Sequence, residues 1–177
     1  MVLVVFSFSI SSAFAAPTVE ITATSVKAVE LTQKVSNLKI VSLANGAADV
    51  ISALGFRDNI IGRDIASTSL AFKRVPIVTS GHQVLAEKVI ALKPDLVIVD
   101  DSVGPKSAIQ LLKSAKLKVI TIRESWNLEE MYVKVSAIGK LLKATNEAKE
   151  LIAKMKLKVT ASKENIGWKP KVLFMYL

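Results

Sequence analysis

The stretch Ala86-Glu-Lys-Val-Ile-Ala-Leu-Lys-Pro-Asp-Leu-Val-Ile-Val99 decides which fold this chain of 177 residues adopts. Its first half has apolar residues at helical spacing and is closed by Pro94, which predicts a helix over residues 85–92. Its second half, residues 95–100, is an apolar run between two aspartates, a pattern typical of a parallel strand that is covered on both faces. A helix followed at once by such a strand predicts an α/β fold with right-handed crossovers.

The neighbouring segments repeat this alternation. Asn45-Gly46 predicts a turn after a first strand, and Gly55 is a suitable residue to end the helix that follows. Further short apolar runs predict more strands, and one more stretch with helical spacing lies between them. We therefore expect one doubly wound α/β lobe with a parallel sheet over residues 38–124, with strands at 39–43, 60–61, 75–79, 95–100 and 118–122 and helices at 47–54, 85–92 and 107–115.

The pattern changes after residue 124. Apolar residues recur every three or four positions over residues 125–165, which predicts one long linker helix with Ser125 or Asn127 as its N-cap. At about 1.5 Å per residue this helix would be on the order of 50 Å long, more than one small lobe requires. Residues 170–177 are predicted to be the first strand of a second lobe. We therefore expect a chain truncated to an amino-terminal lobe, its linker and that strand.

The first residues have the features of an export signal. Residues 1–15 carry no charge and end in Ala13-Phe-Ala15, a small-x-small cleavage pattern, so we predict a signal peptide there and a spacer over residues 16–37. No other stretch is long and apolar enough to span a membrane. The chain has no cysteine, so its stability comes from burial and not from disulfides. The predicted location is secreted and extracytoplasmic.

The net charge is +9, and eight lysines are concentrated in the predicted long helix. Few aromatic residues lie among them and no nucleic-acid motif accompanies them, so we interpret them as a solvated helix face and expect no nucleic-acid partner. Phosphate-binding glycine loops and nucleophile elbows are also absent from the sequence. One histidine without cysteines does not supply a tetrahedral zinc site. The sequence therefore predicts a binding protein and not an enzyme.

The single histidine, His82, follows the predicted strand over residues 75–79 and a glycine, Gly81. In doubly wound α/β proteins, ligands bind at the carboxyl ends of the strands. His82 is therefore the first candidate for a ligand-binding residue.

Three pieces of sequence together resemble one family. They are the strand, Asn-Gly turn and helix ending at Leu54-Gly55, the segment Ile61-Gly-Arg-Asp64, and Ala86-Glu87 leading into Leu92-Lys-Pro-Asp-Leu-Val-Ile98. Over residues 38–177 this combination resembles the substrate-binding proteins of ABC importers for vitamin B12, iron-siderophores and haem. The resemblance implies two α/β lobes joined by a rigid helix, a ligand held between them, and a permease in the membrane as partner.

Within that family, Ser80-Gly-His82 and Asp101-Ser-Val-Gly104-Pro105 resemble the haem-binding branch. The resemblance implies haem as the transported ligand, no intrinsic cofactor, and His82 as an axial ligand of the haem iron, which suits an imidazole nitrogen. Arg63 or Arg123 would meet a haem propionate, because a guanidinium pairs well with a carboxylate. The other expected ligand-binding residues are Asn45, Gly81, Ser102 and Gly104.

Members of the family dock on their permease through an acidic side chain, and this resemblance implies docking roles for Glu87 and Asp49. Two alternatives to haem transport remain open. The same scaffold would carry an iron-siderophore or cobalamin, or the chain is a cytoplasmic α/β enzyme whose start was misread.

Overall fold

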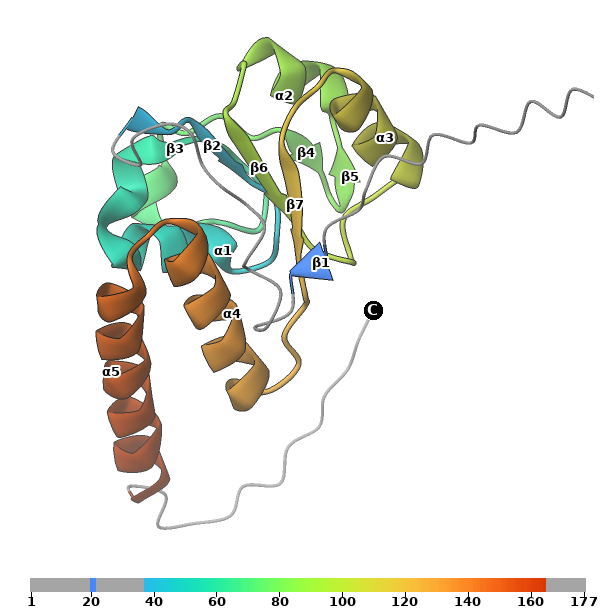
Figure 1. The fold of residues 1–177 in the computed structure, drawn as a ribbon. Coiled ribbons are helices and arrows are strands. Elements are labelled where there is room, and N and C mark those ends of the chain that lie inside the picture. Colours follow the sequence, from blue (N-terminus) through green and yellow to red (C-terminus); the bar gives the residue numbers. More distant parts are fainter. Residues whose placement is uncertain (1–19, 22–36, 165–177) are drawn as a thin grey trace, which may run out of the picture.

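The computed structural model describes residues 20–21 and 37–164 of the chain. Their centre is a five-stranded parallel sheet with the strand order β1-β7-β6-β2-β3 (Figure 1). A separate pair of short antiparallel strands lies beside it. The sheet consists of β1 (Glu20–Ile21), β2 (Ile40–Ser42), β3 (Ile60–Arg63), β6 (Leu96–Val99) and β7 (Val119–Ile122), and the antiparallel pair of β4 (Thr79–Ser80) and β5 (Gln83–Val84).

Helices cover both faces of the sheet (Figure 1). One face carries α1 (Ala47–Ile51), which continues through the turns Ser52–Phe56 and Arg57–Asn59, together with α4 (Leu128–Leu141) and α5 (Thr145–Glu164). The other face carries α2 (Ala86–Ala91) and α3 (Lys106–Ser114). The predicted α/β fold with a doubly wound parallel sheet is confirmed.

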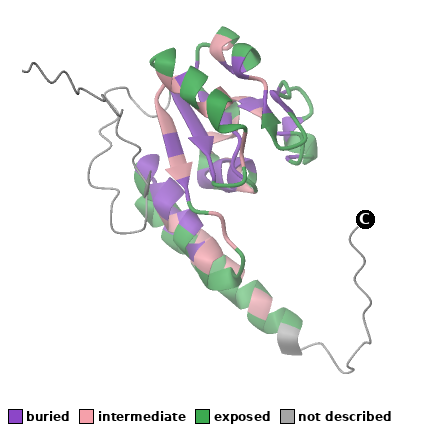
Figure 2. Ribbon diagram, turned by 90° about the vertical axis from the view of Figure 1, so that its right-hand side faces the viewer, coloured by how far each residue is buried: buried purple, intermediate pink, exposed green. Residues whose placement is uncertain are grey.

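Strand β6 shows why the apolar run is continuous. Successive side chains of a strand point to opposite faces. Leu96 and Ile98 belong to the core under α1 and α4, and Val97 and Val99 to the core under α2 and α3. Figure 2 shows the buried sheet between these two helical layers. A strand with two covered faces needs an apolar residue at every position.

The strand order creates a crevice beside β2. The chain runs from β2 outward to β3 and then returns to β6 on the other side of β2. The loops after β2 and β6 therefore leave the sheet toward opposite faces, through α1 and α3 respectively. In open α/β sheets ligands bind in the crevice at such a switch point.

The prediction of one helix over residues 125–165 was wrong in extent. The segment forms two helices that pack side by side, α4 and the 20-residue α5, and the chain reverses between them (Figure 1). Lys143 has a φ of 55° at this reversal, where Leu142 and Ala144 are buried. A long helix is confirmed only for α5. Asn127 is confirmed as the N-cap of α4, because its side chain accepts a hydrogen bond from the Glu130 amide at 2.9 Å.

The predicted strand over residues 75–79 was also wrong in extent. Only Ile77 bridges to the sheet, opposite Arg63, while Thr79–Ser80 pairs antiparallel with Gln83–Val84. Pro76 has no amide hydrogen to donate to a ladder, which explains the interrupted pairing.

Part of the predicted spacer belongs to the fold, because Glu20–Ile21 pairs with β7. The predicted signal peptide at residues 1–15, the rest of the spacer apart from residue 37, and the predicted strand at 170–177 lie outside the described residues. Among the helices in the described part of the chain, none has the length and apolar character needed to cross a membrane.

Ser42 offers a test of the core. It is fully buried in β2, and its hydroxyl has no hydrogen-bond partner within residues 37–164. An unsatisfied buried hydroxyl costs about 1–3 kcal/mol, so we expect Ser42→Ala to raise the free energy of unfolding by about 1 kcal/mol in urea denaturation. Ser114→Ala, at an exposed position of α3, is the control and should change it by less than about 0.5 kcal/mol. A destabilised Ser42→Ala variant would contradict the assignment of that hydroxyl as unpaired.

Candidate ligand pocket

A pocket of about 170 Å³ lies at the carboxyl edge of the sheet, beside the switch point. The loops after β2, β3, β6 and β7 and the turn between β4 and β5 contribute its walls. These segments are far apart in the sequence and meet because all the main strands run parallel. The lining residues are Leu43, Asn45, Asp64, Ile65, Ala66, Thr79, Gly81, His82, Ser102, Val103 and Glu124.

His82 lies in the two-residue turn of the β4–β5 hairpin, which lines this pocket. The hairpin pairs Thr79 with Val84 and Ser80 with Gln83, and Gly81 makes the turn with a φ of 57°. The carbonyl of His82 accepts a hydrogen bond from the Gly104 amide at 3.1 Å, which ties the hairpin to the loop after β6. The His82 ring is exposed and makes no hydrogen bond within residues 37–164.

Asn45 and Ser102, two other predicted site residues, reach the pocket from neighbouring loops and share a partner that the sequence did not reveal. Asp100 ends the β6 segment and is 3% exposed. Its carboxylate accepts hydrogen bonds from the backbone amides of Asn45 (2.8 Å) and Ser102 (3.2 Å). Asp100 therefore joins the loop after β2 to the loop after β6.

A buried lysine lies behind the same wall. Lys134 of α4 is 3% exposed and its Nζ donates to the Asn45 carbonyl at 3.0 Å. Burial lowers the pKa of Lys134, because a desolvated ammonium is costly, while the negative charges of Asp100 and Glu124 act in the opposite direction.

The two predicted propionate partners lie outside the pocket lining. The Arg63 guanidinium donates to carbonyls of its own loop, those of Asp64, Ser67, Phe72 and Val75, so its side chain fixes the segment after β3. Arg123 is exposed, and the next residue, Glu124, lines the pocket instead. Gly104 supports the site only through its backbone bonds to His82 and Val84. Sequence reasoning missed the two acidic lining residues, Asp64 and Glu124.

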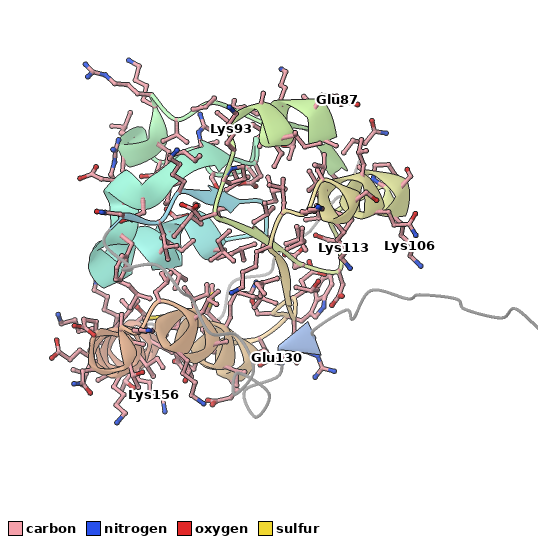
Figure 3. All side chains as sticks on the ribbon, turned by 45° about the horizontal axis from the view of Figure 1, so that its top comes forward. Glu87, Lys93, Lys106, Lys113, Glu130 and Lys156 are labelled. Atoms are coloured by element: carbon pink, nitrogen blue, oxygen red, sulfur yellow. The ribbon has the colours of Figure 1, made fainter. Side chains whose placement is uncertain are left out.

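The two predicted docking residues lie away from the pocket lining. Glu87 is exposed in the first turn of α2, and Figure 3 shows it on the outer side of that helix. Asp49 is exposed in the first turn of α1, on the opposite helical layer.

Known proteins share this sequence pattern and fold. A periplasmic binding protein family model matches residues 40–177. An uncharacterized ABC transporter substrate-binding lipoprotein of Bacillus subtilis is 35% identical over 130 residues, which are 72% of this chain and 41% of that protein. A cobalamin-binding protein of Halobacterium salinarum is 29% identical over 126 residues, 70% of this chain and 34% of that protein. The chain thus spans less than half the length of these curated relatives.

Solved structures agree with this placement. The haem-binding protein HmuT superposes with a TM-score of 0.66 at 27% identity, over 72% of this chain and 44% of that chain. The periplasmic haem-binding protein RhuT of Roseiflexus sp. RS-1 superposes with a TM-score of 0.73 at 25% identity, over 80% of this chain and 56% of that chain. With its parallel sheet, its pocket at the carboxyl edge and a family match over residues 40–177, this chain belongs to the periplasmic binding protein family found among the substrate-binding proteins of ABC transporters.

Proposed function

We propose that this protein binds haem outside the cytoplasm and delivers it to the permease of an ABC importer, without catalysing a reaction. The observation that carries the proposal is the exposed imidazole of His82 on the wall of a pocket at the sheet's switch point. A neutral imidazole nitrogen is a competent axial ligand of haem iron. The likeness to HmuT and RhuT, which are haem-binding proteins by name, supports the same ligand class.

The rest of the pocket suits one face of a flat, apolar macrocycle. Leu43, Ile65, Ala66 and Val103 supply apolar surface beside His82. The volume of about 170 Å³ is well below the several hundred Å³ typical of pockets that enclose a ligand. This lobe therefore covers one side of a haem, and we expect binding by these residues alone to be weak and the ligand to stay exposed.

Export and docking complete the proposal. The extracytoplasmic location is supported by relatives that are named as a lipoprotein and as periplasmic proteins. Glu87 and Asp49 are exposed and outside the pocket lining, as residues that contact a permease while the ligand is bound would be.

Titration with haemin tests the ligand and the role of His82. We expect a Soret shift on binding, and we expect His82→Ala to remove that shift and weaken binding at least about tenfold, since iron coordination is lost. Gln83→Ala changes the neighbouring exposed residue of the hairpin and should bind haemin like the unchanged chain. Equal spectra for the His82→Ala variant and the unchanged chain would refute axial ligation.

A second candidate ligand is cobalamin, because curated relatives at 29% identity are named cobalamin-binding proteins. A calorimetric titration with cyanocobalamin distinguishes cobalamin binding from haem binding. Binding of cyanocobalamin with no haemin spectrum would select the corrinoid, and binding of an iron-siderophore alone would select the third ligand class of the same scaffold.

A further inference from the structure

Behind the pocket wall lies a connected set of polar groups that we call the Asp100 network: Asp100, Asn45, Ser102 and Lys134. Asp100 is buried and its two carboxylate oxygens are both used. Oδ2 accepts from the Asn45 amide at 2.8 Å, and Oδ1 accepts from the Ser102 amide at 3.2 Å and from the Ser102 hydroxyl at 2.6 Å. One carboxylate thus connects two loops that line the pocket.

Asn45 is held from two sides. The backbone amide of Asn45 donates to the buried Asp100 carboxylate, and its backbone carbonyl accepts from Nζ of the buried Lys134 at 3.0 Å. Hydrogen bonds to charged groups are roughly twice as strong as neutral ones, and burial strengthens them further. The Asn45 backbone is therefore fixed, while its side chain remains exposed at the pocket.

The same network sets the chemistry that Ser102 offers. A serine hydroxyl has one proton, and an ionised carboxylate only accepts hydrogen bonds, so the Ser102 proton is donated to Asp100. The Ser102 oxygen is left with lone pairs for a ligand and no donor.

The two residues with a charged side chain in the lining are both acidic. Asp64 and Glu124 contribute carboxylates, and within residues 37–164 no lysine or arginine lines the pocket. Ligand carboxylates are therefore disfavoured at this wall, whereas groups that donate hydrogen bonds are favoured.

We propose that Asp100 is the positioning residue of this pocket and the residue that sets its preference for hydrogen-bond donors over carboxylates. The inference rests on the proposed function for the identity of the ligand. For a haem held by His82, it means that the propionate edge points away from Ser102 and Glu124.

Amide hydrogen exchange tests the positioning role without any ligand. An asparagine at position 100 has one acceptor oxygen and cannot serve both loops, so Asp100→Asn should speed exchange of the Asn45 or the Ser102 amide at least about tenfold. The Ile98 amide in β6 should be unchanged. Asp101→Asn removes the same charge at the adjacent exposed position and should leave both amides protected. Lys134→Met removes the hydrogen bond to the Asn45 backbone carbonyl and should leave the Ser102 amide protected by Asp100.

The preference of the pocket is tested by comparing haemin with its dimethyl ester, which lacks the two negative charges. A merely structural defect weakens both ligands equally. Removing the Asp100 charge should instead raise the affinity for haemin relative to the diester at least about threefold. Glu124→Gln should move this ratio in the same direction, and it keeps the test possible if Asp100→Asn does not fold. Asp101→Asn should not move it.

The outcomes separate this inference from the proposed function. Unchanged exchange at Asn45 and Ser102 in Asp100→Asn would overturn the positioning role. A haemin-to-diester ratio that moves no more than in Asp101→Asn would overturn the preference for donors. If the unchanged chain binds no haemin, the proposed function fails, and amide exchange still decides whether Asp100 positions the two loops.

Discussion

Phe72→Ala is expected to lower the free energy of unfolding by about 4 kcal/mol, because it empties a large site in the core. Phe72 is 0% exposed and ends the short turn Leu70–Phe72 between β3 and β4. Its ring belongs to the hydrophobic core on the face of the sheet that carries α1 and α4. Its carbonyl accepts from the Arg63 guanidinium at 3.1 Å and from the Val75 amide at 2.8 Å. The buried ring and the bonds of the Phe72 carbonyl together hold the segment after β3, which supplies Asp64, Ile65 and Ala66 to the pocket.

Urea denaturation of three variants measures this effect. Leu70→Ala is the matched control, because Leu70 belongs to the same turn and is 88% exposed, and its effect should stay within about 0.5 kcal/mol. Phe72→Leu should lower the free energy of unfolding by less than Phe72→Ala does. It therefore keeps the comparison with Leu70→Ala measurable if the alanine variant unfolds. Equal losses in Phe72→Ala and Leu70→Ala would show that the turn is not fixed through its aromatic side chain.

The sheet was predictable because a strand that is covered on both faces has a continuous run of apolar residues in the sequence. Residues 96–99 are apolar at each position, since Leu96 and Ile98 face one helical layer and Val97 and Val99 the other. The reversal between α4 and α5 has no comparable sequence pattern, because two antiparallel helices show the same apolar period as one continuous helix. Lys143, which carries the left-handed backbone there, is not a residue type that indicates a turn.

The pocket was predictable in part. Asn45 and Ser102 follow strands, and the carboxyl ends of parallel strands meet at one edge. His82 reaches the same pocket through a hairpin outside the main sheet, which the apolar run before it did not indicate. Asp100 reaches Asn45 across 55 positions in the chain, and sequence spacing carries no information on such a bond.

The arginines show a further limit. Side chains near a strand end alternate in direction, so a shift of one residue exchanges the side chain that faces a pocket. Arg123 suits a propionate chemically, yet Glu124 is the lining residue. Arg63 also suits a carboxylate, but backbone carbonyls of its own loop take its donors.

Gly139→Ala is expected to lower the free energy of unfolding by about 2 kcal/mol. A Cβ at position 139 would lie 2.4 Å from the Ala148 Cβ and 3.1 Å from the Ala144 carbonyl oxygen, so α4 and α5 would have to move apart. Overpacking of this kind costs up to about 3 kcal/mol, and the better helix propensity of alanine returns about 1 kcal/mol. Because the helix interior normally favours alanine over glycine, a loss here identifies the interhelical contact as the cause.

Ala148→Gly tests that cause directly. In the Gly139→Ala background it removes the nearer of the two obstructing atoms, so the double variant should be more stable than the sum of the two single changes predicts, by at least about 1 kcal/mol. Ser136→Ala, on the half-buried side of the same helix, controls for propensity and should be neutral or slightly stabilising. Additive effects in the double variant, measured by urea denaturation, would mean that α4 and α5 do not approach at these residues.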